Sequence, residues 1–562
     1  MRNLIKWLKN HYIAIGCIAF FTLLFSIALF TDSLYLGDDL YFHLNRINGI
    51  GNAIRDGQIL PKLYPLTNFE FGYASPLFYC DVFMYPAALL YMLGVPLIIS
   101  YKFTLFFYIF LGTLLSYLCA NALFKNKYNI IFIVMSIYCL NPYRFIDAYY
   151  RSAFSEFLAI TFFPLLLYAF VEVFYRHKDR FILLAISMTC ILLSHNLSFL
   201  LILIVYILLI IIYSILYPTR IKNIFYTSIK AGIIGFLLTA FYTLPMLEQL
   251  LDQIFKVSSY AQSYDISTNI ISMFSTFNLF NIVENSIFSM ADIQRFGIGM
   301  VSLLIPILNY KHFKNKWILA ISCMHYLFLG LAFGWFPIYD LEILNFLQFS
   351  FRFYLLIYLT SIILVSYALI YNNCMVKVIV ILLMAINICL FNYHMMTTDN
   401  QLNNDDEYSV IFAYDVENQS YYDNKQTGVG EYLPIIQEDD YMLDSRQIKT
   451  IVNGEKVDLE IEYNRYMSHI EFEYESEETI QLMLPLTYYK GYKAYAIGDD
   501  GETIELLVYN DDVYKKVSID SLSGNYTYSI QYQSTIIQDV SLWMTLITLI
   551  MLLVCGLKNK NI

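Results

Sequence analysis

Residues Leu36 to Ile47 read LGDDLYFHLNRI and follow directly after the first hydrophobic run of the chain. Two adjacent acids, a histidine and an arginine lie within nine residues here. In a helix, Asp39, His43 and Arg46 share one face, because residues at i, i+4 and i+7 project to the same side. The opposite face is apolar and consists of Leu36, Leu40, Leu44 and Ile47. We therefore predict an amphipathic helix parallel to a membrane, with its leucines in lipid and its carboxylate toward an aqueous cavity.

The composition around this stretch is that of a membrane protein with many spans. The chain has 562 residues, of which 58% are hydrophobic and 14% are charged, and its mean hydropathy is +0.54. These values exclude an ordinary soluble enzyme. The net charge of −11 is unevenly spread, since residues 399–539 hold 29 acidic and 9 basic residues and the remainder holds 17 acidic and 26 basic ones. An acidic soluble domain is therefore attached to a basic membrane domain.

Residue usage argues against a nucleic-acid partner and against a disulfide framework or structural zinc site in the acidic region. The basic residues stand singly in short loops and form no stripe with aromatic residues, so nucleic acid is not an expected partner. The nine cysteines are scattered, and none lies between residues 395 and 539. A disulfide framework or a structural zinc site in that region is thus excluded.

Twelve apolar runs are candidate membrane spans, because a span needs roughly 20 mainly apolar residues. They cover residues 11–30, 101–124, 129–147, 154–174, 181–194, 196–216, 228–248, 296–309, 317–335, 352–371, 376–394 and 540–557. The N-terminal run has no small-residue cleavage site after it, so we expect a retained first span rather than a signal peptide. The predicted fold is a polytopic α-helical membrane protein with about twelve transmembrane helices.

Basic loops are expected on the cytoplasmic side of the membrane. They contain Arg2, Lys6 and Lys9, Lys125 and Lys127, Arg176 to Arg180, Arg220 and Lys222, Lys311 to Lys316, and Lys558 and Lys560. These loops share one side only if the apolar segment Leu77 to Ile98 does not cross the membrane. We expect that segment, which two prolines interrupt, to re-enter or to lie along the outer interface. Both termini are then cytoplasmic.

The region 395–539 lies outside the cell in this topology. Stretches such as KVDLEIEY, HIEFEYE and YTYSIQY alternate apolar and polar residues, which is typical of strands. We therefore predict a β-rich, sandwich-like extracytoplasmic domain at 395–539. It follows a transmembrane domain at 1–394, whose first external loop is 31–100, and it precedes a final transmembrane helix and a short cytoplasmic tail at 540–562.

Charged and polar residues from segments far apart in the sequence gather at the outer membrane face in this topology. They are Asp38, Asp39, His43, Arg46, Arg144, Asp147, Arg151, Glu156, His195, Glu248 and Arg352. Ionisable groups at the rim of a membrane are costly and indicate function, and we expect them to line one polar cavity. A carboxylate there can accept a proton from a hydroxyl nucleophile, and arginines can hold a phosphate leaving group.

Eight of these residues also have a purely structural interpretation. Asp38 could serve only as a helix N-cap, and Asp39 could be a solvated loop acid. His195 could hydrogen-bond a helix end, and Arg352 could extend its guanidinium to the membrane surface. The remaining alternative is an ion-pair network that joins two helices, formed by Arg144, Asp147, Arg151 and Glu156.

Several motifs occur in an order that resembles a bacterial membrane protein family. They are GDDLYFHLNRI, GQILPKLYP, FGYASPLFYCDVFMYPAALL, DAYYRSAFSEFLAITFFPLLL, LSHN, FYTLPMLE, LQFSFRF and GVGEYLP. Together they resemble the YfhO-like proteins and those labelled 6-pyruvoyl-tetrahydropterin-synthase-related, although nothing in these motifs suggests pterin chemistry. Both groups look like members of the GT-C superfamily of membrane glycosyltransferases.

The resemblance implies an inverting glycosyltransferase whose active site lies at the outer face. The donor would be a polyprenyl-phosphate sugar, and the acceptor a cell-surface glycan, a teichoic-acid-like polymer or a lipid. Asp39 matches the acid of the D-x-x-F-H pattern and would act as general base, with Asp38 as its neighbour. The other matches are His43 and Arg46 in the same motif, Glu156 in R-x-A-x-x-E, His195 in S-H-N and Arg352 in Q-F-x-x-R.

Other functions remain open from the sequence. A divalent metal ion, Mg²⁺ or Mn²⁺, could be held by Asp39, Glu156 and His195, although no compact ligand motif demands one. A transporter or flippase for a lipid-linked glycan would be expected to have paired broken helices near the middle of the bilayer. A non-catalytic factor for assembly of the cell envelope would depend on the β-rich region rather than on Asp39.

Overall fold

The computed structural model describes residues 2–68, 70–258, 308–336, 347, 349–403, 430–436, 447–452, 455–466, 468–511 and 513–558. Of the predicted run 296–309, only residues 308 and 309 are among the described residues. Gln348 of the Q-F-x-x-R motif also lies outside the described residues. The chain forms two compact units. The first contains Met1–Leu40, Tyr101–Phe236 and Tyr260–Asn404, and the second contains Tyr41–Ser100, Leu237–Ser259 and Asp405–Ile562. Each unit thus combines segments that lie far apart in the sequence. The predicted domains, in contrast, are continuous ranges chosen by residue composition.

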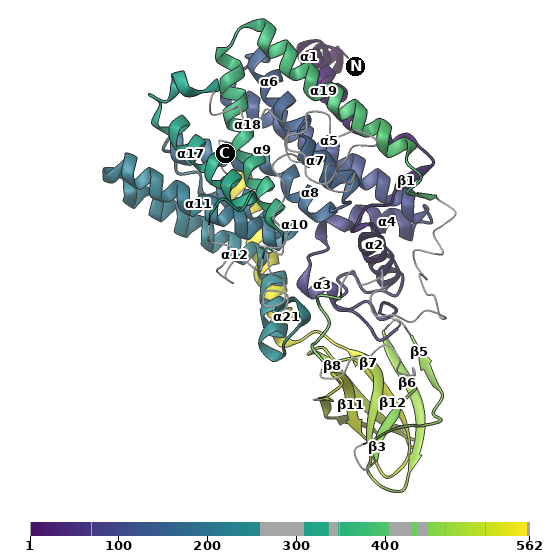
Figure 1. Ribbon diagram of the computed structural model, residues 1–562. Coiled ribbons are helices and arrows are strands. Elements are labelled where there is room, and N and C mark those ends of the chain that lie inside the picture. The colour runs from purple at the N-terminus through teal and green to yellow at the C-terminus, as the bar shows by residue number, and fades with distance from the viewer. Residues whose placement is uncertain are drawn as a thin grey trace. The chain divides into compact units, whose positions relative to one another are not determined.

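Helices make up the first unit (Figure 1). They are α1 (Arg2–Phe25), η1 (Ile27–Phe30), α5 (Leu97–Phe124), α6 (Tyr128–Cys139), α7 (Pro142–Phe145), η3 (Ile146–Tyr150), α8 (Phe154–Thr161), α9 (Phe163–Phe170), η4 (Val171–Tyr175), α10 (Phe181–Ser194), α11 (Asn196–Leu216), η5 (Pro218–Arg220), α12 (Ile221–Asp252), η7 (Tyr310–His312), α17 (Lys316–Ala332), η10 (Ser350–Phe353), α18 (Tyr354–Tyr371) and α19 (Cys374–Thr397). Helices α5 and α12 each have one end in the second unit.

Seven helical segments among the described residues are long and apolar enough to cross a membrane. They are Leu97–Phe124, Phe154–Tyr175, Asn196–Leu216, Pro218–Asp252, Ser350–Tyr371, Cys374–Thr397 and Ile536–Cys555. An eighth is formed if α6 and the segment Pro142–Tyr150, which bend by 49° at their junction, make one span. The predicted runs near residues 11–30, 181–194 and 317–335 form shorter apolar helices, Tyr12–Phe25, Phe181–Ser194 and Lys316–Ala332. The protein is therefore mostly helical, with seven or eight candidate spans.

Asparagine side chains begin several of these helices. Asn141 accepts a hydrogen bond from the backbone N–H of Tyr143 at 3.0 Å, and Pro142 occupies the first turn. Asn373 caps α19 in the same way through Val376 N at 2.9 Å. An N-terminal asparagine satisfies an otherwise unpaired backbone donor, and proline already has the helical φ angle. Local sequence therefore sets the break between α6 and α7.

The segment Leu77 to Ile98 is divided into short helices. They are α3 (Ser75–Phe78), η2 (Val82–Met84) and α4 (Tyr85–Met92), and α5 begins at Leu97. Pro86 starts α4, and Gly94 follows its end with φ +92°. The helices α3, η2 and α4 are each too short to cross a bilayer.

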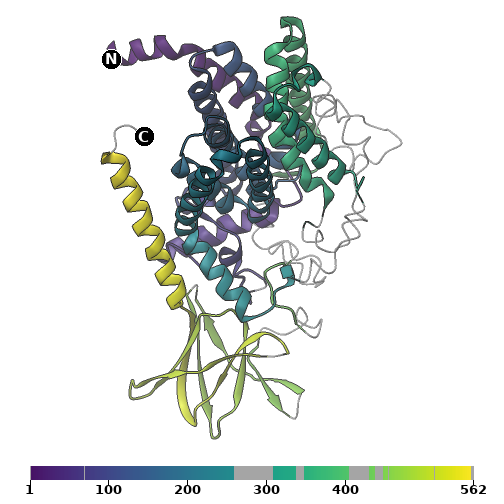
Figure 2. The same ribbon diagram turned by 90° about the vertical axis from the view of Figure 1, so that its left-hand side faces the viewer.

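The C-terminal region of the second unit is built of antiparallel strands, as its alternating pattern predicts (Figure 2). One five-stranded sheet has the order β10-β11-β7-β3-β4, and the other has the order β5-β6-β12-β8-β9. The strands are β3 (Lys449–Val452), β4 (Glu455–Asp458), β5 (Tyr463–Arg465), β6 (His469–Ser476), β7 (Gln481–Thr487), β8 (Tyr492–Gly498), β9 (Thr503–Leu506), β10 (Val508–Asn510), β11 (Lys516–Asp520) and β12 (Gly524–Tyr532). Leucines of β7 and aromatic residues of β6 and β12 share one apolar core, so the two sheets pack face to face.

Helix α2 (Leu40–Arg55) corrects the predicted amphipathic arrangement. Both faces are buried, because Leu40, Leu44 and Ile47 are 0% exposed and His43 and Arg46 are 1% exposed. Arg46 donates from Nε to Asp81 Oδ1 at 2.8 Å and from Nη2 to the Cys80 carbonyl at 2.9 Å. The apolar side of α2 therefore packs against protein, and its arginine forms a buried ion pair.

The end of α12 joins the strands and the last helix, α21 (Ile536–Lys558), within the second unit. Gln249 makes two hydrogen bonds with the backbone of Lys490, and Thr545 on α21 donates to the Leu237 carbonyl. Glu248, predicted to line the outer cavity, accepts a 2.6 Å hydrogen bond from Thr535. Its observed role is thus to hold the start of α21 against α12.

We expect the substitution Asp81→Asn to destabilise the protein by about 3–5 kcal/mol, because it leaves the Arg46 guanidinium buried without its counter-ion. Thermal unfolding of the detergent-solubilised protein measures this loss. Glu505→Gln is the matched control, since Glu505 forms an ion pair with Lys493 on the exposed surface of the sheet and should leave unfolding unchanged. Equal effects of the two substitutions would contradict a special role for the buried pair.

Candidate functional site

The turn that carries Asp39 is anchored by a short strand pair in the first unit. Strand β1 (Ser33–Tyr35) pairs antiparallel with β2 (Gln401–Asn403). The backbone N–H of Leu36 then donates to the Asn400 carbonyl at 3.1 Å, and the N–H of Asp39 donates to the Arg151 carbonyl at 2.9 Å. Because these bonds connect residues about 110 and 360 positions apart in sequence, the position of Asp39 depends on tertiary structure.

Glycine is required two residues before Asp39. A Cβ atom added at Gly37 would lie 2.7 Å from the Tyr150 carbonyl oxygen, closer than real Cβ contacts allow. The small residue therefore lets this turn approach the backbone at 150–152. Ser152 on the other side has φ +50°, a conformation that ends the preceding helix.

Asp147, Arg151 and Glu156 are brought together by an irregular stretch between α7 and α8. Residues Ile146–Tyr150 form a π-helical turn, η3, and Arg151 N donates to the Ile146 carbonyl at its end. Such turns interrupt an α-helix locally and often occur at functional sites. The two acids consequently face the same arginine from opposite sides of the break.

Arg151 is shared by two buried carboxylates. Its Nη1 donates to Asp147 Oδ1 at 2.5 Å and to Glu156 Oε2 at 2.9 Å. Tyr143 donates its hydroxyl to the other oxygen, Glu156 Oε1, at 2.5 Å, and the ring of Phe351 lies 4.7 Å from the guanidinium carbon. The predicted ion-pair network is thus present for Asp147, Arg151 and Glu156.

Hydrogen-bonding capacity remains in this cluster. The Oδ2 atom of Asp147 is buried and has no hydrogen-bond partner among the described residues. Within the same part of the chain, Nε and Nη2 of Arg151 make no hydrogen bond. An unsatisfied buried carboxylate oxygen is costly, so a ligand hydroxyl or a proton at this position would be stabilising.

The side chain of Asp39 is exposed to solvent and makes no hydrogen bond or ion pair with the described residues. Desolvation raises the pKa of Asp39 to about 6, and Arg151 and Arg352 oppose this rise while Asp38 and Glu156 add to it. A general base poised near neutral pH is what proton transfer from a hydroxyl requires.

His195 and Arg352 complete the surroundings of the acids. His195 lies between α10 and α11, and its Nδ1 is 2.7 Å from Ser198 Oγ, which agrees with a residue that hydrogen-bonds a helix start. Burial lowers the pKa of His195 to about 4; Glu156 raises it, and Arg352 and Arg151 lower it further. The imidazole is therefore neutral at physiological pH. Arg352 is placed by the short helix η10, with its guanidinium 5.7 Å from the Phe349 ring.

Arg144 does not join the acid cluster through any hydrogen bond among the described residues. It is 0% exposed, and its guanidinium carbon lies 4.5 Å from the Phe25 ring, 4.8 Å from Tyr138 and 5.3 Å from Phe157. A cation surrounded by aromatic faces is stabilised by their quadrupoles. The structure therefore places Arg144 among aromatic rings, and its buried Nε and Nη1 atoms have no hydrogen-bond partner among the described residues.

Three predicted site residues belong to the second unit and have structural partners there. His43 Nδ1 lies 3.2 Å from Arg46 Nη1, and Arg46 is paired with Asp81. Glu248 binds Thr535. Asp39 precedes α2 instead of lying within it, so the predicted helical spacing of Asp39, His43 and Arg46 does not describe the site. Asp38 is exposed beside Asp39.

Sequence reasoning missed several residues that shape the site. Tyr143 and Phe351 contact the charged cluster, and Gly37 admits the turn. The only signals for them were a tyrosine beside Arg144, a phenylalanine beside Arg352 and a glycine before two acids. Such neighbours are too common in an aromatic-rich chain to be singled out.

The suggested metal site is not formed by the described residues. No group of three or more His, Cys, Asp or Glu side chains in that part of the chain is arranged to hold a metal ion. Asp39, Glu156 and His195 influence one another electrostatically, but Glu156 already uses both oxygens on Arg151 and Tyr143. The donors observed therefore fit proton transfer and anion binding better than metal ligation.

Comparison with known sequences shows the family. Residues 76–397 match the family described as "6-pyruvoyl-tetrahydropterin synthase related domain; membrane protein". Because this match covers more than half of the chain, the protein belongs to that family of membrane proteins. The match includes Arg151, Glu156, His195 and Arg352, whereas Asp39 precedes it.

A relative from Lactococcus lactis subsp. cremoris (strain MG1363), named "Uncharacterized protein", is 23% identical over 335 residues. The aligned part is 58% of this chain and 53% of the relative, so the chain matches about half of the relative's length. The family description places the chain among membrane proteins, and neither name states a reaction.

The raised pKa of Asp39 predicts a pH-dependent effect of Asp39→Asn on stability. An acid whose pKa rises from 3.8 to about 6 on folding stabilises the folded state when protonated, and this contribution is lost as the pH rises through that window. The neutral asparagine avoids the loss. The variant should therefore gain unfolding temperature relative to the wild type between about pH 4.5 and about pH 7.5. A constant difference between the two proteins across this range would show that Asp39 is not desolvated.

Proposed function

We propose that this protein is a membrane glycosyltransferase of the GT-C type. It would transfer a sugar from a polyprenyl-phosphate donor to a hydroxyl of an extracytoplasmic acceptor, which is a cell-surface glycan, a teichoic-acid-like polymer or a lipid. The observation that supports it most is the Asp39 carboxyl group, which has no partner among the described residues, keeps solvent access and has a pKa raised to about 6. An exposed carboxylate with a pKa near neutral pH is suited to accept a proton from a substrate hydroxyl.

In the proposed reaction, Asp39 accepts the proton of the acceptor hydroxyl. The oxygen of that hydroxyl bonds to the anomeric carbon of the donor sugar while the bond from this carbon to the phosphate oxygen breaks. The electron pair of the broken bond leaves with the polyprenyl phosphate, and single displacement inverts the anomeric configuration. General base catalysis of this kind contributes about 10²–10⁴-fold to a rate.

Positive charge near Asp39 would stabilise the departing phosphate. Arg151 and Arg352 both lie close enough to lower the pKa of Asp39, and Arg151 has nitrogens that make no hydrogen bond with the described residues. Guanidinium groups match phosphate oxygens in geometry and charge. Asp147 and Glu156 would hold Arg151 in place, and the neutral imidazole of His195 would donate or accept a hydrogen bond from a sugar hydroxyl.

The orientation that this reaction needs is the one predicted from loop charges. Both termini would be cytoplasmic, about twelve helices would span the membrane, and the site and the β-rich region would face outward. No metal ion is assigned a step, because both oxygens of Glu156 accept hydrogen bonds from Arg151 and Tyr143.

A transporter or flippase of lipid-linked glycans is the second candidate, and one feature favours it. The junction of α6 with Pro142–Tyr150 is bent by 49° and carries the buried Asp147. Transporters commonly use interrupted helices in pairs, whereas the described residues contain one bent pair of this kind. An assembly factor that works through its β-rich region is the remaining alternative.

The first test compares surface-glycan composition in cells that carry the wild type, Asp39→Asn, Asp38→Asn or a deletion, with membrane levels checked. We expect Asp39→Asn to lose the same sugar decoration as the deletion and Asp38→Asn to keep it. Asp38 is a matched control because it removes one charge from the same turn. If Asp39→Asn restores the decoration, Asp39 is not the base, and transport or assembly becomes the preferred function.

The transfer rate should also depend on pH. A base with a pKa of about 6 is active when deprotonated, so the rate should fall about tenfold per pH unit below that value and level off above it. Transfer by membranes from cells that make the protein measures this profile. A rate that is independent of pH between about pH 5 and about pH 7 would contradict the assignment of Asp39.

A further inference from the structure

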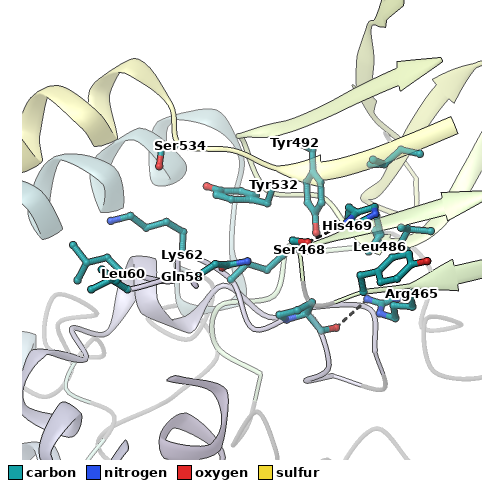
Figure 3. A pocket seen from close by; sticks show the side chains of 16 residues that line it. Gln58, Leu60, Lys62, Arg465, Ser468, His469, Leu486, Tyr492, Tyr532 and Ser534 are labelled. Carbon is teal, nitrogen blue, oxygen red and sulfur yellow. Dashed lines mark hydrogen bonds between the residues drawn. The ribbon is translucent and has the colours of Figure 1, made fainter. Parts of the chain in front are cut away.

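A polar cavity lies within the second unit, between the loop after α2 and the sheet β5-β6-β12-β8-β9. Its volume is about 320 Å³, and its lining comes from residues 58–65 and from strands or strand ends of this sheet and of β7. Figure 3 shows Gln58, Leu60 and Lys62 on the loop side and Tyr492 and Tyr532 on the sheet side. None of these residues belongs to the Asp39 site, which lies in the first unit.

The charge of this cavity is opposite to that of the region around it. Lys62, Arg465 and His469 line it, and none of its sixteen lining residues is acidic, although residues 399–539 hold 29 acidic and 9 basic residues. The Lys62 ammonium makes no hydrogen bond or ion pair with the described residues; burial lowers its pKa, and the nearby Cys80 and Asp539 oppose this shift. A cation that lines a cavity without a direct ion pair attracts an anion.

An unsatisfied hydroxyl also faces this space. Tyr492 is 7% exposed and lines the cavity, and its hydroxyl has no hydrogen-bond partner among the described residues. Buried tyrosine hydroxyls normally find a partner. Arg465 approaches the same region from β5, where its Nη2 donates to the Pro65 carbonyl at 2.9 Å and so fixes the guanidinium at the loop.

Aromatic rings supply the remaining surface. Tyr466 and His469 stack with their ring centroids 4.4 Å apart, and the rings of Tyr492 and Tyr532 meet edge to face at 5.4 Å. Tyr466 is 46% exposed. Flat apolar faces beside polar hydrogen-bonding groups suit a ligand that has both C–H surfaces and hydroxyls.

We propose that this cavity binds an anionic saccharide, a sugar unit that carries a phosphate or carboxylate group. Lys62 and Arg465 would hold the anion, the Tyr492 hydroxyl would bond a sugar oxygen, and the aromatic rings would contact the sugar ring. A neutral glycan would leave the cations unused, and inorganic phosphate would leave the aromatic faces unused. If the protein is the proposed glycosyltransferase, this site would bind the acceptor, but binding itself does not depend on transfer.

The test measures binding to the purified full chain in detergent by calorimetry, with glucose 6-phosphate, glucose and inorganic phosphate as probes. Glucose 6-phosphate should bind more tightly than glucose or inorganic phosphate alone. Lys62→Gln should weaken this binding about tenfold or more, because a charged hydrogen bond is lost, and added salt should weaken it too. Tyr492→Phe should weaken it about two- to tenfold.

Tyr492→Phe also separates a binding role from a structural one. Its hydroxyl has no partner to lose within the described residues, so the unfolding temperature should stay unchanged or rise. Tyr528→Phe is the matched control on the neighbouring strand, since its hydroxyl accepts a hydrogen bond from Leu522 N at 2.9 Å. It should lower stability and leave binding unchanged.

Three outcomes would overturn the proposal. They are no saturable binding of glucose 6-phosphate, equal binding of inorganic phosphate, and binding that Lys62→Gln and Tyr492→Phe do not change. Vesicles of anionic phospholipid are tested in the same way. If the vesicles bind at this cavity and glucose 6-phosphate does not, the cavity binds lipid headgroups instead. Asp39→Asn should bind the sugar phosphate like the wild type, so a failure of the transferase proposal leaves this result intact.

Discussion

The site in the first unit depends on one buried arginine that two buried carboxylates share. Arg151 neutralises Asp147 and Glu156 at 2.5 Å and 2.9 Å, and its backbone carbonyl accepts the N–H of Asp39. Removing a partner from such a group leaves an uncompensated charge in the interior, which is strongly destabilising. The same residue therefore holds the helix break together and positions the turn that carries Asp39. Stability and the proposed chemistry are coupled through it.

Burial separates these ionisable groups into different roles. Arg46 is paired with Asp81, Arg144 is surrounded by aromatic rings, and Arg151 is clamped by two acids. Asp39 differs from the other acids of its cluster, because its carboxyl group has no partner among the described residues and remains open to solvent. Carboxylates whose two oxygens both have partners, such as Glu156, belong to the scaffold. A carboxylate that is open to solvent and has a shifted pKa is the one available for a substrate.

The two proposed ligand sites use different chemistry for different tasks. The Asp39 site combines acids and arginines, which suits proton transfer next to a departing phosphate. The cavity in the second unit combines cations with aromatic faces and contains no acid among its lining residues, which suits retention of an anionic sugar. In the proposed transferase, binding of the acceptor away from the reacting atoms would raise its local concentration.

The sequence alone determined the membrane class, the β-rich region after residue 395 and the prominence of Asp39, because these follow from hydropathy, period-two alternation and the rarity of charge. It also found Asp147, Arg151 and Glu156, whose spacing is local. Only the tertiary structure decided which charges pair: Arg46 is committed to Asp81, 35 residues away, and Glu248 to Thr535, 287 residues away. It likewise formed the cavity of Lys62 and Tyr492. Electrostatic partners and desolvation depend on three-dimensional proximity, which no local pattern encodes.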